Sequence, residues 1–210
     1  MVCRISRTML AGALVVWVNL LMSACSTSVQ VAGEVPTLLV PALSRHVTYV
    51  EPKNLVAYVH EEKLPRGGEW SIALGQMNQV FFRQLMASMF TTVTRIETVE
   101  PSDILPAAEG KDHDGMIRID LVEYGFLTPE LSGLNFYSAS AKYRVELADA
   151  SSQSLGVWQV VGYGKAEAGG FQAGEAVNAA TVMAIRDAGA RIALELPDQS
   201  FFSAWLEATN

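Results

Sequence analysis

Cys25 is the residue whose neighbours most clearly point to chemistry in this sequence. It directly follows Ser23 and Ala24, at the end of an uncharged run over residues 8–22, and two arginines precede that run. A basic start, an apolar run and small residues at a cleavage point are, in this order, typical of an export signal. The run has 15 residues, whereas a membrane-spanning helix needs about 20. We therefore expect a signal peptide over residues 1–24 that is removed rather than retained.

Residues 20–25 resemble the lipobox of bacterial lipoproteins, although Met22 stands where that family usually has leucine. The resemblance implies that the sulfur of Cys25 receives a diacylglycerol, that cleavage occurs just before this residue, and that its freed amine is acylated. Two acyl chains already hold a protein stably on a bilayer, so three would anchor the mature protein permanently. The alternative is an ordinary secretory signal with an incidental cysteine.

The residue after the cysteine bears on location. In lipoproteins of two-membrane bacteria, an aspartate at this place often directs retention at the inner membrane. Ser26 occupies the place here. The resemblance therefore implies an outer-membrane lipoprotein that faces the periplasm, with the membrane as a partner through the N-terminal lipid.

The other side chains with chemical potential form no recognisable site. The three histidines, His46, His60 and His113, are far apart in sequence. Asp112 and Asp114 flank His113, but adjacent loop residues rarely converge on one ion, and a metal site would need further ligands. The sequence has no Gly-x-Ser-x-Gly elbow. We predict no catalytic, metal or cofactor-binding residues and no enzymatic activity, and we interpret these polar residues as solvated surface.

Composition narrows the class of partner. Removing residues 1–24 leaves 186 of the 210 residues, and because two arginines and no acid are lost, the net charge changes from −7 to −9. An acidic chain argues against nucleic acid, whose binding needs clustered lysine and arginine. The only cysteines are Cys3, in the signal, and Cys25. The mature fold therefore needs a core that is sufficient without disulfides.

The mature chain divides into a tether and one domain. Residues 26–36 are small and polar, so we expect a lipidated tether over 25–36. Eleven flexible residues would have an end-to-end distance of about 18 Å. A single periplasmic domain over 37–210 follows.

Hydrophobic periodicity predicts the elements of that domain. Predicted strands cover 37–43, 54–60, 95–99, 116–122, 139–147 and 157–163, and the last three form an antiparallel meander. Predicted loops cover 61–69, 106–115 and 128–134. Long helices are predicted over 71–93 and 174–196, and an apolar patch, expected to be tucked down, comprises Phe201, Phe202, Trp205 and Leu206.

The two helices differ in how they must pack. The first has an apolar stripe that includes Phe81 and Leu85, so it must lie against a sheet or a partner subunit. The second is rich in alanine, which allows close approach to a sheet. The predicted fold class is α+β: a mixed, largely antiparallel sheet with two long helices packed on it, in the order β-α-β-β-β-β-α.

This order of elements resembles the periplasmic domains of the curli-secretion lipoprotein, the Pel-polysaccharide export lipoprotein and the amino-terminal domain of TolB. The resemblance covers about residues 37–196 and implies a non-enzymatic accessory or assembly component of an envelope export system. An envelope protein or a second copy of the chain would be its partner. The alternatives are an auxiliary lipoprotein of a lipid or solute transporter and an envelope hydrolase, for which the sequence offers no residues.

Overall fold

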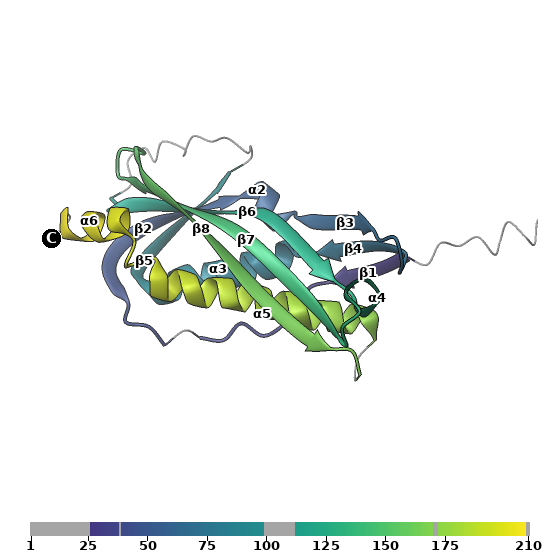
Figure 1. The fold of residues 1–210 in the computed structure, drawn as a ribbon. Helices are drawn as coiled ribbons and strands as arrows, with labels where there is room; N and C mark the ends of the chain where they lie inside the picture. Colours follow the sequence, from purple (N-terminus) through teal and green to yellow (C-terminus); the bar gives the residue numbers. More distant parts are fainter. Residues whose placement is uncertain (1–25, 38, 99–111, 170–171, 209–210) are drawn as a thin grey trace, which may run out of the picture.

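The computed structural model describes residues 26–37, 39–98, 112–169 and 172–208, which form two sheets and five helices on an elongated body (Figure 1). The helices are α2 (Lys53–Val56), α3 (Gly75–Met89), α4 (Pro129–Ser132), α5 (Ala173–Glu195) and α6 (Ser200–Ala208). Among the described residues, no helix combines the length and hydropathy that crossing a membrane requires.

The larger sheet has five strands in the order β5-β2-β6-β7-β8. Their bounds are Phe90–Thr98 for β5, Leu43–Pro52 for β2, Gly115–Leu127 for β6, Phe136–Asp149 for β7 and Ser154–Glu167 for β8. Strand β2 pairs in parallel with both β5 and β6, whereas β6, β7 and β8 form an antiparallel meander.

The smaller sheet has the order β1-β4-β3. Its strands are β1 (Ser26–Gln30), β4 (Glu69–Ala73) and β3 (Val59–Lys63), with β1 parallel and β3 antiparallel to β4. The predicted α+β class with a mixed sheet is confirmed. The largely antiparallel character also agrees with the structure, because most of the paired residues lie in the antiparallel pairings of β6, β7 and β8.

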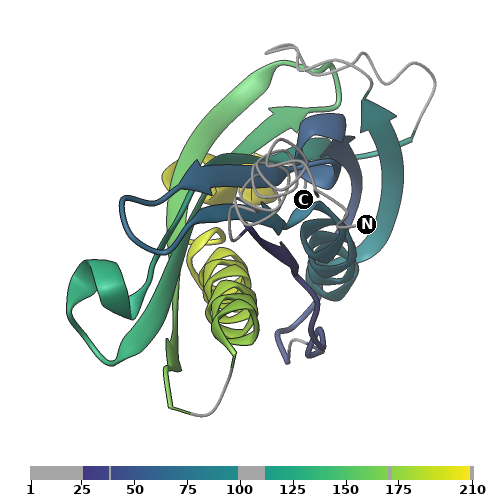
Figure 2. The same ribbon diagram turned by 90° about the vertical axis from the view of Figure 1, so that its right-hand side faces the viewer.

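Helices α3 and α5 cover one face of the larger sheet, here called the helix face (Figure 2). The stripe of α3 lies inside the molecule: Phe81 and Leu85 are 2% and 1% exposed. The ring of Phe82 packs edge-on against Tyr143 of β7, with 4.9 Å between the centroids. Of the two placements left open for this helix, packing within the chain is therefore the one observed.

Helix α5 approaches the sheet closely because glycine and alanine meet at the contact. An added Cβ at Gly162 or Gly164 of β8 would overlap the backbone of α5 at Ala184 or Ala180. On its other side, α5 presents Gly189 to the ring of Phe81, and a Cβ there would overlap that ring. The alanine-rich composition thus acts as predicted, since it lets helix and strand backbones nearly touch.

Helix α5 also covers the outer edge of β8. The backbone N–H of Tyr163 donates to Asp187 Oδ2 at 2.9 Å, and Arg191 Nη1 donates to the carbonyl of Val161 at 2.9 Å. Side chains of the helix therefore satisfy backbone groups that an edge strand would otherwise expose.

Several predicted elements are wrong in the first third of the domain. In the predicted strand at 37–43, Thr37 and residues 39–42 are irregular and Leu43 begins β2. Pro41 in this run lacks an amide donor. The first part of the predicted strand at 54–60 belongs to α2, where Leu55 is buried, whereas Val59 and His60 lie in β3. The predicted loop at 61–69 contains the end of β3 and the start of β4.

The first long helix is shorter than predicted at both ends. Its predicted start, Ser71, lies in β4, where the alternate residues Trp70 and Ile72 are buried. At the other end Phe90 is already extended, with φ −128° and ψ 147°, and opens β5. The apolar stripe continues across both boundaries, which is why the sequence pattern suggested one long helix.

Residues 26–30 are not a flexible tether but strand β1. Val29 is buried, and Val31 just beyond the strand is 1% exposed. The side chain of Asn178 on α5 exchanges two hydrogen bonds with the backbone of Ala32, at 2.9 and 3.1 Å. The two buried valines and the hydrogen bonds from Asn178 hold this segment against the domain.

The C-terminal apolar patch forms α6 and is tucked down as predicted. Phe202 and Trp205 are 0% and 5% exposed, and their rings pack edge-on at 5.2 Å. Trp205 Nε1 donates to the carbonyl of Asp114 at 3.1 Å, which ties the helix to the start of β6. Phe201 lies against Gly156 of β8, where a Cβ would overlap the ring.

Candidate functional site

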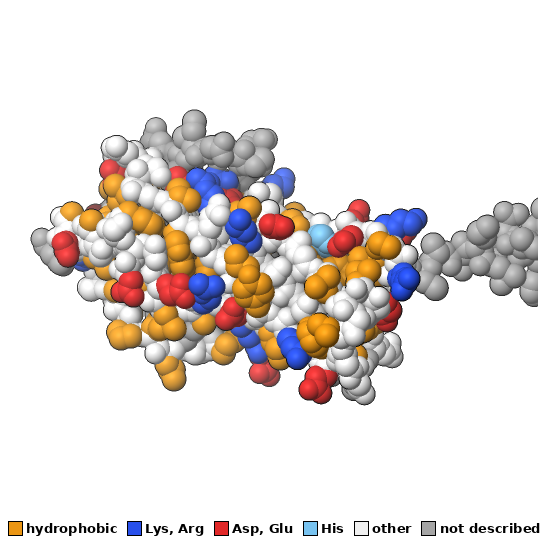
Figure 3. Space-filling view, viewed as in Figure 1, with side chains coloured by type: hydrophobic (Ala, Val, Ile, Leu, Met, Phe, Trp, Pro, Cys, Tyr) orange, Lys and Arg blue, Asp and Glu red, His pale blue; other side chains and the backbone are white. Residues whose placement is uncertain are grey.

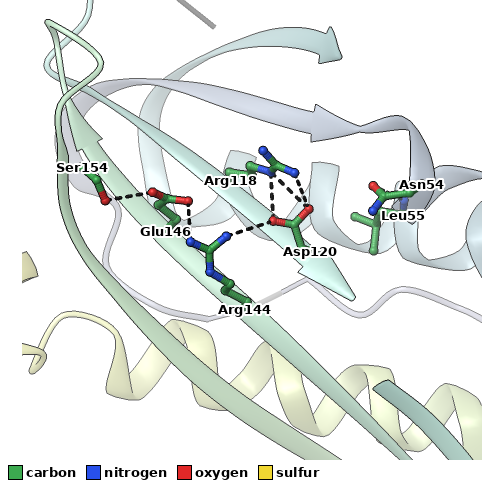
Figure 4. Close-up of polar contacts among 7 residues, drawn as sticks. All are labelled: Asn54, Leu55, Arg118, Asp120, Arg144, Glu146 and Ser154. Atoms are coloured by element: carbon green, nitrogen blue, oxygen red, sulfur yellow. Dashed lines mark hydrogen bonds and ion pairs between the residues drawn. The ribbon is translucent and has the colours of Figure 1, made fainter. Parts of the chain in front are cut away.

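The face of the larger sheet opposite the helices carries a network of four charged side chains (Figure 4). Arg118 and Asp120 on β6 are joined by a hydrogen bond from Nη2 to Oδ1 of 2.9 Å. On β7, Arg144 Nη2 lies 3.1 Å from Glu146 Oε2, and its Nη1 lies 3.9 Å from Asp120 Oδ2. Ser154 of β8 donates to Glu146 Oε1 at 2.8 Å.

The strand register creates this network. Alternate residues of a strand point to the same face, and Asp120 pairs with Arg144 while Arg118 pairs with Glu146 across β6 and β7. Opposite charges therefore lie directly across from each other. Arg118 and Glu146 are only 4% exposed each, and both carboxylates contact guanidinium groups. A carboxylate held in this way serves to align the strands and is poorly suited to acid–base chemistry.

Beyond the network, the same face is hollowed into a groove of about 540 Å³. Three strands line it at the end of the meander where β6 ends and β7 begins. Its lining comprises Gly125, Phe126, Leu127, Ser138, Ala139, Ser140, Tyr163, Gly164 and Lys165. Figure 3 shows this side of the molecule, where hydrophobic side chains lie among acidic and basic ones.

Small residues make the floor of the groove and large ones its rim. Gly125 pairs with Ser140 across β6 and β7, so little side-chain volume fills the centre. Leu127 and Tyr163 at the rim are 50% and 64% exposed. Lys165 Nζ lies 4.0 Å from the centroid of the Phe136 ring, a cation–π contact that holds the ammonium at the edge. The groove thus offers apolar surface and one cation.

The three histidines contact different elements. His46 Nε2 lies 2.9 Å from Thr94 Oγ1 between β2 and β5. His60 Nε2 lies 3.0 Å from Glu62 Oε2 on β3, and its ring packs edge-on against Tyr124 at 5.0 Å. Both act in packing and hydrogen bonding.

His113 differs from the solvated residue that we expected, because it is 7% exposed. Its neighbour Asp114 accepts from the backbone N–H of His46 at 2.8 Å, so this carboxylate already holds the chain. Within the ranges that the structure describes, no group of three His, Cys, Asp or Glu side chains is arranged to hold a metal ion. Residues 106–111 of the predicted charged loop lie outside those ranges, as do Cys3 and Cys25.

Sequence reasoning identified neither the charged network nor a further buried acid, Glu51. Glu51 of β2 is 1% exposed on the helix face. It accepts from Arg83 Nε at 2.8 Å and from Gln79 Nε2 at 3.3 Å, both on α3. Burial raises the pKa of Glu51, but the hydrogen bonds from Arg83 and Gln79 outweigh burial and hold the pKa below its ordinary value. Glu51 directly precedes Pro52, and nothing in the local sequence indicated that it would pair with Arg83.

Two tyrosines on the helix face are similarly committed to the structure. The Tyr143 hydroxyl donates to Asn78 Oδ1 at 2.7 Å, and the Tyr124 hydroxyl lies 2.7 Å from Thr181 Oγ1. Burial raises the pKa of both phenols. They therefore stay protonated and fasten α3 and α5 to the sheet.

The comparisons with known proteins yield weak structural likeness. No protein-family model matches the chain, and no curated protein matches it. A candidate lipoprotein from Caulobacter crescentus is 14% identical with a TM-score of 0.33, over 47% of this chain and 71% of that one. A candidate homologue of the neuraminyllactose-binding hemagglutinin from Helicobacter pylori is 11% identical with a TM-score of 0.45, over 87% of this chain and 98% of that one.

A hypothetical protein from Chlamydia trachomatis is 13% identical with a TM-score of 0.42, over 79% of this chain and 99% of that one. All three lie below 25% identity and below a TM-score of 0.5, so we base no functional assignment on them. They lend no support to the resemblance to the curli-secretion, Pel-export and TolB domains.

Proposed function

We propose that this chain is a bacterial lipoprotein anchored through acylated Cys25 to the periplasmic face of the outer membrane. The observation that carries the proposal is the basic start, the uncharged run over 8–22 and the small pair before Cys25. The next residue, Ser26, already lies in strand β1, so the folded domain extends to the predicted cleavage site. Ser26 in place of aspartate favours the outer membrane.

At the membrane, the domain would act as a non-enzymatic accessory or assembly component of an envelope export system. The polar clusters that we find among the described residues favour a binding role over catalysis. The network centred on Arg118 and Glu146 consists of paired charges, and Tyr124 and Tyr143 are held by hydrogen bonds. The groove bordered by Leu127 and Tyr163 provides apolar surface for a protein or lipid partner.

The same groove favours a second candidate, an auxiliary lipoprotein of a lipid or solute transporter. A volume of about 540 Å³ falls within the range of small-molecule sites, about 300–1,000 Å³. Lys165 at its edge would suit an anionic headgroup. An envelope hydrolase stays the least favoured alternative, since we assign it no nucleophile and base among the described residues.

Metabolic labelling with palmitate tests the anchor. We expect label on the wild-type protein and none on Cys25→Ala, which should also keep its signal or be cut elsewhere. Cys3→Ala is the matched control, because this second cysteine lies within the signal and should leave labelling unchanged. Equal label on wild type and Cys25→Ala would exclude the lipoprotein assignment.

Fractionation and crosslinking then test location and partner. Ser26→Asp should move the protein from the outer to the inner membrane, and a wild-type protein already at the inner membrane would contradict the sorting proposal. A photo-crosslinker at Ser140, on the groove floor, should capture an envelope protein if the export role is correct. Capture of phospholipid alone would favour the transporter role.

A further inference from the structure

We infer that one end of the domain, formed by the start of β1 and the loop between β3 and β4, rests on the phospholipid headgroups of the anchoring membrane. This surface, called the tip, comprises Ser26 and residues 63–69. The inference rests on the proposed acylation of Cys25. It commits the tip to lipid rather than to a protein partner.

The length of chain between lipid and domain carries the inference. Ser26 is already a strand residue, paired in register with Glu69 of β4. Consecutive Cα atoms are about 3.8 Å apart, so an acylated Cys25 would leave no slack between lipid and sheet. A flexible tether of eleven residues would instead allow about 18 Å. Strand β1 therefore brings the folded domain directly to the headgroups.

Strand direction decides which other residues reach the membrane. Strands β1 and β4 are parallel and begin at the same end, whereas β3 is antiparallel to β4 and ends there. Glu69 thus lies between Ser26 and Lys63, and Lys63 Nζ lies 2.9 Å from Glu69 Oε1. The loop that joins β3 to β4 projects at this end of the molecule (Figure 1).

Hydrogen bonds give the loop between β3 and β4 a defined conformation. The backbone N–H of Leu64 donates to the carbonyl of Gly68 at 3.0 Å. Trp70 Nε1 donates to the carbonyl of Gly67 at 3.1 Å, and the Trp70 ring is 5% exposed. Gly67 and Gly68 have φ of 107° and 83°, which non-glycine residues rarely adopt. The tip therefore has a defined shape beside the attachment point.

The side chains of the tip suit the headgroup layer. Arg66 is exposed at the loop, and a guanidinium matches the geometry of a lipid phosphate. Leu64 is buried, and Pro65 beside it is exposed. With its leucine turned inward and an arginine outward, the loop would touch phosphates without entering the hydrocarbon.

This placement sets the orientation of the whole domain. Helix α6 and the β7–β8 turn lie at the opposite end from β1, β3 and β4 (Figure 1), so they would project away from the membrane. The groove lies nearer the tip, because its lining residue Phe126 packs against Trp70 with 5.2 Å between ring centroids. A lipid leaving the bilayer would meet the groove first, and a soluble partner would meet α6.

The experiment uses the full acylated protein in vesicles of phosphatidylethanolamine and phosphatidylglycerol. Fluorophores are placed on Arg66→Cys at the tip and, as the matched control, on Gln153→Cys in the exposed β7–β8 turn. Acylation blocks Cys25 and cleavage removes Cys3, so each variant has one free thiol. With a quencher attached to lipid headgroups, we expect several-fold stronger quenching at position 66 than at 153.

A second variant separates the inference from the proposed function. Twelve glycine and serine residues inserted between Ser26 and Thr27 keep Ser26 after the cysteine and should abolish the difference in quenching. Equal quenching at 66 and 153 in vesicle-bound protein without the insertion would overturn the inference. Protein that carries no fatty acid and does not bind vesicles would instead overturn the proposed anchoring.

Discussion

The two faces of the five-stranded sheet are built on different principles. On the helix face, Gly162 and Gly164 bring β8 into backbone contact with α5, and Gly189 receives the ring of Phe81. On the other face, oppositely charged side chains pair across β6 and β7, and an open groove lies beyond them. The helix face is organised by close packing, and the other face by paired charges. We therefore expect substitutions on the helix face to cost more stability than substitutions at the groove.

The largest effect should follow a change in volume on the helix face. Gly164→Val would drive a side chain into the backbone of α5 at Ala180 and Ala184, neither of which can yield locally. Because domains have only about 5–15 kcal/mol of stability, we expect residues 26–210 carrying this change not to fold. Circular dichroism and gel filtration would show the loss.

Gly125→Ala on the opposite face is its control. An added Cβ there would lie 3.8 Å from Ser140 Oγ, an ordinary contact, so the free energy of unfolding should change by less than about 0.5 kcal/mol. A folded Gly164→Val protein, or an unfolded Gly125→Ala protein, would contradict the contrast between the faces.

Phe81→Ala should have the next largest effect. The side chain is 2% exposed and fills the space over Gly189, so its removal loses transfer free energy and leaves a cavity, at a cost of about 3–5 kcal/mol. Thermal melting should show the loss, while gel filtration should show the same elution volume as the wild type. An unchanged melting temperature would mean that α3 does not pack as described.

Glu51→Gln tests the buried charge on the helix face. Loss of the ionic hydrogen bonds from Arg83 should cost about 1–3 kcal/mol at pH 7. Because the folded-state pKa of Glu51 lies below its ordinary value of 4.5, its contribution is complete above the unfolded-state pKa. The contribution is lost as the pH falls through the folded-state pKa. In urea unfolding, the free energies of unfolding of the variant and the wild type should therefore converge below pH 4.5. A difference that stayed constant down to pH 2, roughly two units below an unperturbed carboxyl pKa, would contradict this.

Tyr163→Ser should have the smallest effect on stability and a clear effect on binding. Its side chain is 64% exposed at the groove rim, so we expect the free energy of unfolding to change by less than about 0.5 kcal/mol. Crosslinking from Ser140 should nevertheless fall, since the rim contact is lost. Gln159→Ser, exposed on the same face of β8 but outside the groove lining, should leave crosslinking unchanged.

Local sequence determined the elements whose partners are close in the chain. The meander was predicted at 116–122, 139–147 and 157–163, within the observed β6, β7 and β8, and the last long helix at 174–196 matches Ala173–Glu195. Each has a regular apolar period, and neighbouring strands pair in order. The predicted export signal before Cys25 is likewise a local pattern, and it lies outside the described residues.

Tertiary structure alone decided the elements whose partners are distant. Strand β4 is hidden in sequence because Trp70 and Ile72 continue the apolar stripe of α3, and only pairing with β1 and β3 makes it a strand. The sequence of β1 resembles a polar tether, and only its pairing with residues 69–73 of β4 identifies it as a strand. The charged network requires a register that sets Asp120 opposite Arg144. The physical reason is that a strand's hydrogen bonds and a sheet's cross-strand pairs are made with residues that no local pattern identifies.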